Sequence, residues 1–280
     1  MSGDDFRVRP MRPEEVALAV DWAAAEGWNP GLADAGCFAA ADAGGFLIGE
    51  HQGKSAATLS VVNHGPRFAF LGFYIVRPEL RGRGFGFRTW QAGIARAGVR
   101  SIGLDGVVAQ QDNYRKSGFV FAYNNVRYGG VPAGLRPGEA TVPLGEVPFD
   151  LIAQSDAAVF PADRPDFVRG WIGSKGHQGR ALIRNGRLVA WGVIRPCRRG
   201  RKVGPLVADD RAAAQAVLAA LAGHDNSEIF LDVPQPNGDA VGLARSLALT
   251  PVFETARMYR GSVRSVALEK VFGVTTFELG

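Results

Sequence analysis

The 280-residue sequence contains few of the features that mark metal-binding, secreted or membrane-spanning chains. Cys37 and Cys197 are its two cysteines, and they lack the C-x-x-C spacing of a zinc or redox site, so we expect reduced structural thiols and no metal. No uninterrupted apolar run approaches membrane-spanning length. The first ten residues, MSGDDFRVRP, are acidic and polar rather than a charged and then apolar leader. These absences predict a cytoplasmic protein that makes no membrane contact.

The charge is also modest for a nucleic-acid-binding protein, at a formal net value of +5. The densest basic run is RPCRRGRK, residues 195–202, which lies between two strand-like segments and contains Pro196 and Gly200. It is most simply a solvated hairpin turn, because no aromatic residues are interleaved for bases to stack on. We therefore predict no nucleic-acid partner. Contact of this turn with an anionic substrate remains an alternative.

A glycine-rich stretch, VRPELRGRGFG, joins an apolar run to a helix-like segment over residues 76–86. Gly82, Gly84 and Gly86 let the backbone turn with positive φ and point successive N–H groups at one place, where the helix N-terminus adds further donors. Arg81 and Arg83 supply positive charge. The stretch matches neither the G-x-G-x-x-G of dinucleotide folds nor the Gly-Lys-Ser/Thr of NTPases. It predicts a phosphate site of another kind.

Arg81, Gly84 and Gly86 meet the R/Q-x-x-G-x-G/A pattern, and the loop resembles the pyrophosphate loop of the GNAT superfamily of acyl-CoA N-acyltransferases. The resemblance implies that the acyl donor is CoA-bound, with acetyl-CoA as the expected cofactor. It also implies that the CoA pyrophosphate binds the loop and that the pantetheine lies along the end of the preceding strand. The cofactor-binding residues expected on this basis are Tyr74, Ile75, Val76, Arg81, Gly82, Arg83, Gly84, Phe85 and Gly86.

Two halves of the chain repeat one order of elements, which predicts a tandem α/β (α+β) protein. The first half shows strand-like segments at 6–11, 44–51, 55–64, 68–76, 101–108 and 119–130, with helices at 13–27, 32–41, 87–98 and 111–118. The second half shows strands at 179–186, 187–196, 202–208, 228–234 and 251–261, with helices at 164–176, 211–223 and 238–249. We expect two GNAT-like domains, each a mixed, mostly antiparallel sheet flanked by helices. The expected bounds are 1–132 and 146–280, with a linker at 133–145.

The segment NYRKSGF resembles the superfamily element whose tyrosine lies beside the CoA sulfur and commonly acts as general acid. The resemblance gives that role to Tyr114, since a phenol stays protonated at neutral pH and can serve a departing thiolate. A tyrosine that simply packs on the sheet is the alternative. Asp105, on a neighbouring strand, is the candidate base, and a strand-end cap is its alternative. His64 is expected at the surface.

Acceptor specificity in this family lies largely in the first helix pair, here EGWNPGLADAG, so Trp28 and Asn29 are candidate substrate-binding residues. A tryptophan that fills the core beneath the helix turn is an equal alternative. From the second half, Arg195, Asp232 and Asn237 are the polar candidates for substrate recognition.

The second half is expected to have lost its own CoA site. Pro205 has no N–H to donate where the glycine loop should recur, and Asp209 and Asp210 precede the next helix, where they would repel a phosphate. The sequence therefore predicts one N-acetyltransferase site per chain, acting on a small-molecule amine or amino-acid-like acceptor. A catalytically inactive CoA-binding sensor or scaffold is the alternative.

Overall fold

The structure is a computed structural model that describes residues 5–223 and 226–280. Its strands are β1 (Phe6–Pro10), β2 (Phe46–His51), β3 (Lys54–His64), β4 (Phe68–Val76), β5 (Ser101–Val107), β6 (Val120–Gly130), β7 (Val142–Pro143), β8 (Gln178–Arg184), β9 (Arg187–Pro196), β10 (Arg201–Ala208), β11 (Ile229–Pro234), β12 (Thr250–Arg260) and β13 (Val271–Gly273). Its α-helices are α1 (Val16–Ala25), α2 (Asp34–Ala41), α3 (Phe85–Ala97), α4 (Gln111–Lys116), α5 (Phe149–Val159), α6 (Pro165–Ile172), α7 (Arg211–Ala222) and α8 (Gly238–Ser246).

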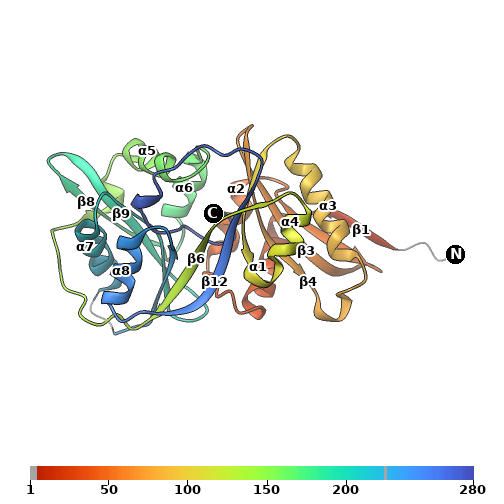
Figure 1. Cartoon of the computed structure of the whole chain (residues 1–280), viewed down its shortest axis with the longest axis horizontal. Coiled ribbons are helices and arrows are strands. Elements are labelled where there is room, and N and C mark those ends of the chain that lie inside the picture. The colour runs from red at the N-terminus through yellow and green to blue at the C-terminus, as the bar shows by residue number, and fades with distance from the viewer. Residues whose placement is uncertain (1–4, 224–225) are drawn as a thin grey trace.

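The architecture confirms the predicted α/β fold with two halves of the same order. Both halves run strand, helix, strand, helix, strand: β4, α3, β5, α4 and β6 in the first, and β10, α7, β11, α8 and β12 in the second. Figure 1 shows the halves side by side, each with helices covering its sheet. The short strand β13 and helix α5 were not expected from the sequence.

All the strands form one sheet in the order β1-β2-β3-β4-β5-β12-β6-β11-β10-β9-β8-β7, with β13 paired to β10. The two halves therefore exchange strands at the centre. β12, from the second half, pairs with β5 and β6 of the first, and β6 pairs with β11 of the second. Figure 1 shows β6 and β12 crossing the middle of the molecule together. Neither half completes its sheet with its own strands alone.

Apolar clusters hold the helices to this sheet. One lies beneath α7 and α8 of the second half, and another packs α3 on β3 to β5 of the first. A third combines side chains of both halves, among them Phe38, Phe73, Trp171 and Trp191, and lies beneath α1, α2, α5 and α6. Because burial of apolar surface drives association, this shared cluster joins the halves in addition to the exchanged strands.

The expectation that His64 lies at the surface is wrong. It is buried at the end of β3 rather than exposed, with its ring edge-on to Phe160 and Phe167. Burial, aided by the Arg164 charge, lowers the pKa of His64 to about 3. The aromatic neighbours come from α6 and the segment before it, so only the packing of the second half on the first reveals this environment.

The middle of the basic run, residues 197–200, forms the predicted turn between β9 and β10. The expectation that the whole run is solvated is wrong, because Arg195 of β9 and Lys202 of β10 are buried. The side chains of the turn are engaged with other parts of the chain: Arg198 pairs with Asp21, and Arg199 pairs with Glu228. None of the helices in the described residues has both the length and the apolar character needed to cross a bilayer. The described residues also contain no cluster of acidic, histidine and cysteine side chains arranged to hold a metal ion.

Candidate active site

A pocket opens in the first half where two parallel strands separate. β4 pairs with β5 only from Phe68 to Leu71, and the strands diverge beyond that point. Phe73, with a φ of 49°, lies at an irregularity between β3 and β4 that bends the strand away. The pocket has a volume of about 330 Å³, and its lining includes Glu26, Trp28, Phe73, Tyr74, Val76, Arg81, Asp105, Gln110, Tyr114, Phe253, Thr255, Phe277 and Glu278.

The glycine loop adjoins one end of this pocket. Gly82 and Gly84 have φ values of 77° and 80°, and a side chain at either would meet only open space. Gly84 is the N-cap of α3 and provides no side-chain cap, so the first N–H groups of the helix are left for another acceptor. Arg81, which lines the pocket, donates through Nε to the Val76 carbonyl and through its guanidinium to Glu26. This arrangement fits an anionic group such as a pyrophosphate.

Gly86 serves a different purpose from its two neighbours. A Cβ there would lie 2.7 Å from the Tyr74 hydroxyl and 2.8 Å from a Val76 methyl. The residue therefore allows the first turn of α3 to pack closely on β4. Arg83 stacks on the Phe85 ring at 4.9 Å and contacts His51, so its side chain lies along the outside of the loop.

Tyr114, on α4, lies in the pocket wall with its ring stacked on Trp90 at a centroid distance of 5.6 Å. A Cβ at Gly106 of β5 would lie 2.2 Å from the Tyr114 ring, so the glycine permits this close approach. Burial, with a smaller contribution from Tyr74, raises the pKa of Tyr114 to about 12. Its phenol is therefore a proton-bearing group throughout the neutral range.

Asp105 also lines the pocket, but its carboxylate is fully engaged. Arg257 of β12 donates to both of its oxygens, at 2.8 and 2.6 Å, and Asn125 of β6 donates to one of them at 2.8 Å. Both side chains of the ion pair are almost completely buried. Because both oxygens already bind the side chains of neighbouring strands, the geometry favours a structural role for Asp105 over the role of base.

The two candidate substrate-binding residues from the first helix pair, Trp28 and Asn29, lie in different places. Trp28 lines the pocket, whereas Asn29 binds the β9–β10 turn by exchanging two hydrogen bonds with the Arg199 backbone, each 2.9 Å long. Asn29 has a φ of 52°, a left-handed conformation that asparagine tolerates. It joins the halves beside the pocket rather than within it.

The three candidates from the second half lie outside the pocket lining. Arg195 is buried, donates to Asp34 at 3.0 Å and stacks on Trp171 at 4.4 Å. Asp232 accepts both hydrogen bonds of a buried ion pair with Arg127. Asn237 caps α8 by accepting from the Ala240 N–H, and its amide donates to the carbonyls of Glu269 and Val271. Arg195 and Asp232 therefore take part in buried ion pairs, and Asn237 fixes the backbone at the start of α8.

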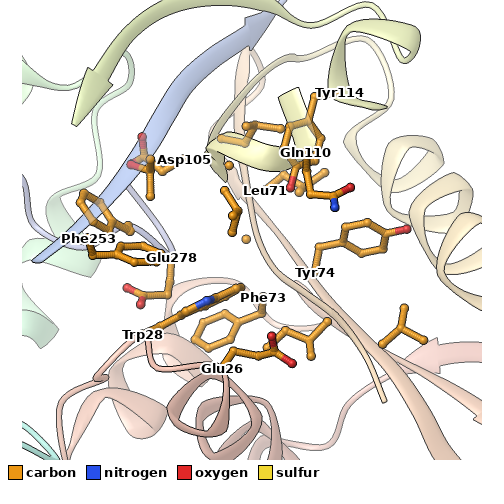
Figure 2. Close-up of a pocket in the computed structure, with 18 of the residues that line it drawn as sticks. Glu26, Trp28, Leu71, Phe73, Tyr74, Asp105, Gln110, Tyr114, Phe253 and Glu278 are labelled. Atoms are coloured by element: carbon orange, nitrogen blue, oxygen red, sulfur yellow. The ribbon is translucent and has the colours of Figure 1, made fainter. Parts of the chain in front are cut away.

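Other lining residues were not anticipated. Phe253 comes from β12, and Phe277 and Glu278 come from the last residues of the sequence. Figure 2 shows Tyr114, Gln110 and Tyr74 toward one side of the pocket, with Trp28, Phe253 and Glu278 toward the other. The apolar run VFGVTTFELG at 271–280 has no counterpart in the repeat. This difference between the halves is the sequence feature that could have indicated a distinct role for the segment.

Comparisons with known proteins agree with this geometry. Residues 13–119 match the acetyltransferase (GNAT) family, and residues 152–273 match an acetyltransferase (GNAT) domain. The chain is 27% identical over 277 residues to the holothin acyltransferase of Pseudoalteromonas sp. (strain SANK 73390), covering 97% of this chain and 94% of that protein.

Two solved structures share the fold. A Pyrococcus horikoshii protein classed among the acetyltransferases superposes with a TM-score of 0.85 at 20% identity, covering 100% of this chain and 98% of that one. A tandem GNAT protein from the clavulanic acid biosynthesis pathway superposes with a TM-score of 0.62 at 14% identity, covering 92% and 98%. With both halves matched by the family and the fold shared along the chain, the protein belongs to the GNAT superfamily, as an N-acetyltransferase with two tandem GNAT domains.

Proposed function

We propose that the first half transfers an acyl group, with acetyl-CoA as donor, to the amine of a small-molecule acceptor. The observation that carries the proposal is the convergence of three features on one pocket: the open glycine loop, the separated strands β4 and β5, and the phenol of Tyr114. Acyl transfer needs a bound thioester, a neutral amine and a proton for the leaving thiolate.

The chain's own groups divide these tasks. The N–H groups at the start of α3 and the turn at Gly82 and Gly84 would bind the pyrophosphate of CoA, which supplies the activated acyl thioester. The strand separation leaves the end of β4, from Tyr74 to Val76, paired with β3 but without backbone partners on β5, so the backbone groups on its β5 side are available to the pantetheine. Tyr114 would donate its proton to the thiolate that departs, while the proton that the attacking nitrogen loses passes through water and restores the phenol.

The second half supports this site rather than duplicating it. Asp210 is the N-cap of α7 and accepts from the Ala213 N–H at 2.8 Å, so a carboxylate occupies the position that a pyrophosphate would need. Asp209 pairs with Lys270. We propose that each chain binds a single acyl-CoA, in the first half.

A thiol-release assay with acetyl-CoA tests the activity directly. The acceptors are holothin, because the 27%-identical relative is named for it, together with polyamines, aminoglycosides and amino acids. Release of CoA that depends on an amine, with the acetylated amine identified by mass spectrometry, is the expected result. Tight CoA binding without amine-dependent release from any acceptor would instead favour the sensor or scaffold alternative.

A further inference from the structure

The last residues of the sequence fill the cleft of the second half. β10 and β11 pair in parallel only over 201–203 and 229–231, and then separate as β4 and β5 do. β13 enters this gap by pairing with Leu206 and Val207 of β10, and Val274 donates to the Asp232 carbonyl of β11 at 2.9 Å. The space left beside the segment is about 30 Å³, against about 330 Å³ in the first half.

Beyond that cleft, the segment continues into the pocket of the first half. A Cβ at Gly72 of β4 would lie 2.1 Å from the Glu278 carbonyl oxygen, so the backbones meet closely there. Thr276 holds the turn by accepting from the N–H groups of Glu278 and Leu279. Figure 1 shows residue 280 at the centre of the molecule, between the halves. The second half thus supplies Phe277 and Glu278 to the pocket.

Glu278 has an unusual environment for a carboxylate. It is 2% exposed, and neither of its carboxylate oxygens has a hydrogen-bond partner. A buried polar group without a hydrogen-bond partner is costly, so a carboxyl group of this kind in a pocket wall points to a ligand that binds it. Figure 2 shows Glu278 beside Phe253 and Trp28, on the side of the pocket away from Tyr114.

The neighbouring positively charged side chains of the described residues donate no hydrogen bond to Glu278. The positive charges of Arg127, Arg195 and Lys202 all interact electrostatically with Glu278, but none of the three is bonded to it. Arg127 is paired with Asp232, and Arg195 donates to Asp34 through Nε alone, while its two terminal nitrogens have no hydrogen-bond partner in the described part of the chain. Lys202 has no hydrogen-bond partner for its ammonium. Burial, and then the Arg127 charge, lowers the pKa of Lys202, which weakens it as a counter-charge.

The remaining lining restricts the ligand further. Among the described residues that line the pocket, the other acids are already satisfied: Glu26 pairs with Arg81, and Asp105 with Arg257. Arg81 is the cation of the lining, and it lies beside the glycine loop. The side opposite Tyr114 therefore presents aromatic walls and one free carboxylate. It suits a cationic amine on a flat apolar body and, among the described residues, offers the Thr255 hydroxyl, but no cation, to a carboxylate next to that amine.

We propose that Glu278 binds the amino group of the acceptor, and that the acceptor is an aromatic or otherwise flat amine without a carboxylate beside its nitrogen. The proposal rests on the acyl-transfer function proposed above. It assigns acceptor recognition to a residue that the second half delivers, and it excludes α-amino acids from the expected acceptors.

Calorimetric titration of the CoA-saturated protein tests the proposal without requiring turnover. The probes are 2-phenylethylamine and phenylalanine, which share a ring and an amine and differ by a carboxylate. We expect 2-phenylethylamine to bind at least about tenfold more tightly, because phenylalanine would bury a carboxylate without a cationic partner. Equal affinity for the two probes, or no binding of 2-phenylethylamine, would overturn the acceptor class.

Three variants locate the interaction. Glu278→Gln should weaken 2-phenylethylamine binding by at least about tenfold, since it keeps the shape and removes the charge. Glu278→Asp keeps the charge but shortens the side chain by one methylene. Its affinity for 2-phenylethylamine should lie between those of the wild type and Glu278→Gln. Glu269→Gln makes the same chemical change at an exposed position just before the segment and should bind 2-phenylethylamine with wild-type affinity.

The affinity for CoA shows that each variant retains a folded first half. A Glu278→Gln protein that binds CoA normally and retains wild-type affinity for 2-phenylethylamine would remove Glu278 from acceptor recognition. The thiol-release assay is independent of this titration. Failure to acetylate any amine would contradict the proposed function, whereas unchanged amine binding in Glu278→Gln contradicts only this inference.

Discussion

Asp105 of β5 and Arg257 of β12 form a buried ion pair in which the arginine donates to both carboxylate oxygens, although the residues come from opposite halves of the chain. The same relationship recurs between Arg127 of β6 and Asp232 of β11. In each pair, the aspartate lies on a strand of one half and the arginine on the strand exchanged from the other. The two pairs therefore fix the register of the exchanged strands at the centre of the sheet.

We predict that Asp105→Asn lowers the free energy of unfolding by about 3–5 kcal/mol, because it leaves the buried Arg257 charge without its partner. Urea unfolding measures the change. Asp112→Asn, which breaks the exposed pair with Arg115, is the matched control and should cost less than about 1 kcal/mol. A similar small loss for both variants would show that the central pair does not hold the halves together.

Gly84→Glu is expected to abolish CoA binding measured by calorimetry. The new carboxylate would stand at the N-cap of α3, in open space where the pyrophosphate is proposed to bind. Gly65→Glu is the control, because Gly65 also has positive φ and open surroundings but lies in the turn between β3 and β4 rather than at a helix N-terminus. Both variants carry similar backbone strain, so CoA binding retained by Gly84→Glu would exclude the loop as the anion site.

For Tyr114→Phe we predict a fall in kcat on the order of a hundredfold, with the affinity for CoA little changed, since the ring stays and the proton donor is lost. Single-turnover measurements isolate the chemical step. Tyr128→Phe, at another buried tyrosine outside the pocket lining, should leave kcat unaltered. Wild-type chemistry in Tyr114→Phe would assign its ring to packing on Trp90 alone.

Acid should destabilise the protein through His64. Its pKa is lowered to about 3 in the folded state, so the unfolded chain binds a proton as pH falls through about 6.5 while the folded chain does not. Between about pH 7.5 and 5.5, His64 should therefore contribute a loss of about 1.4 kcal/mol in the free energy of unfolding. Urea unfolding of His64→Gln at both pH values should show a smaller difference than the wild type. An identical difference would mean that His64 is not held neutral.

The sequence predicted most elements because each has a clear local pattern. The alternating strands, the Ala-rich α7 and the glycine loop before α3 follow from hydrophobic periodicity and backbone chemistry. Tyr114 and Trp28 were also predicted as site candidates, and both lie in the pocket lining. The strand exchange was not predictable, because β6 and β12 occupy equivalent places in the repeat and local patterns do not say which half either strand joins.

The missed parts of the site depend on contacts between distant segments. Glu278 is one residue in an apolar run, and its position in the pocket follows from the path of 271–280 through the second cleft. Asn237 and Arg195 looked like free polar groups in the sequence, but one caps a helix and the other pairs with Asp34 of the first half. Sequence patterns identify polar residues, whereas the fold decides which of them face a pocket.

The central claim is that the first half holds the single acyl-CoA site and that the second half, its cleft filled by the chain itself, supports it. Titration of CoA into the full chain by calorimetry tests this most directly. The account predicts one site per chain in the wild type and none in Gly84→Glu. Two sites in the wild type, or binding that persists in Gly84→Glu, would contradict it.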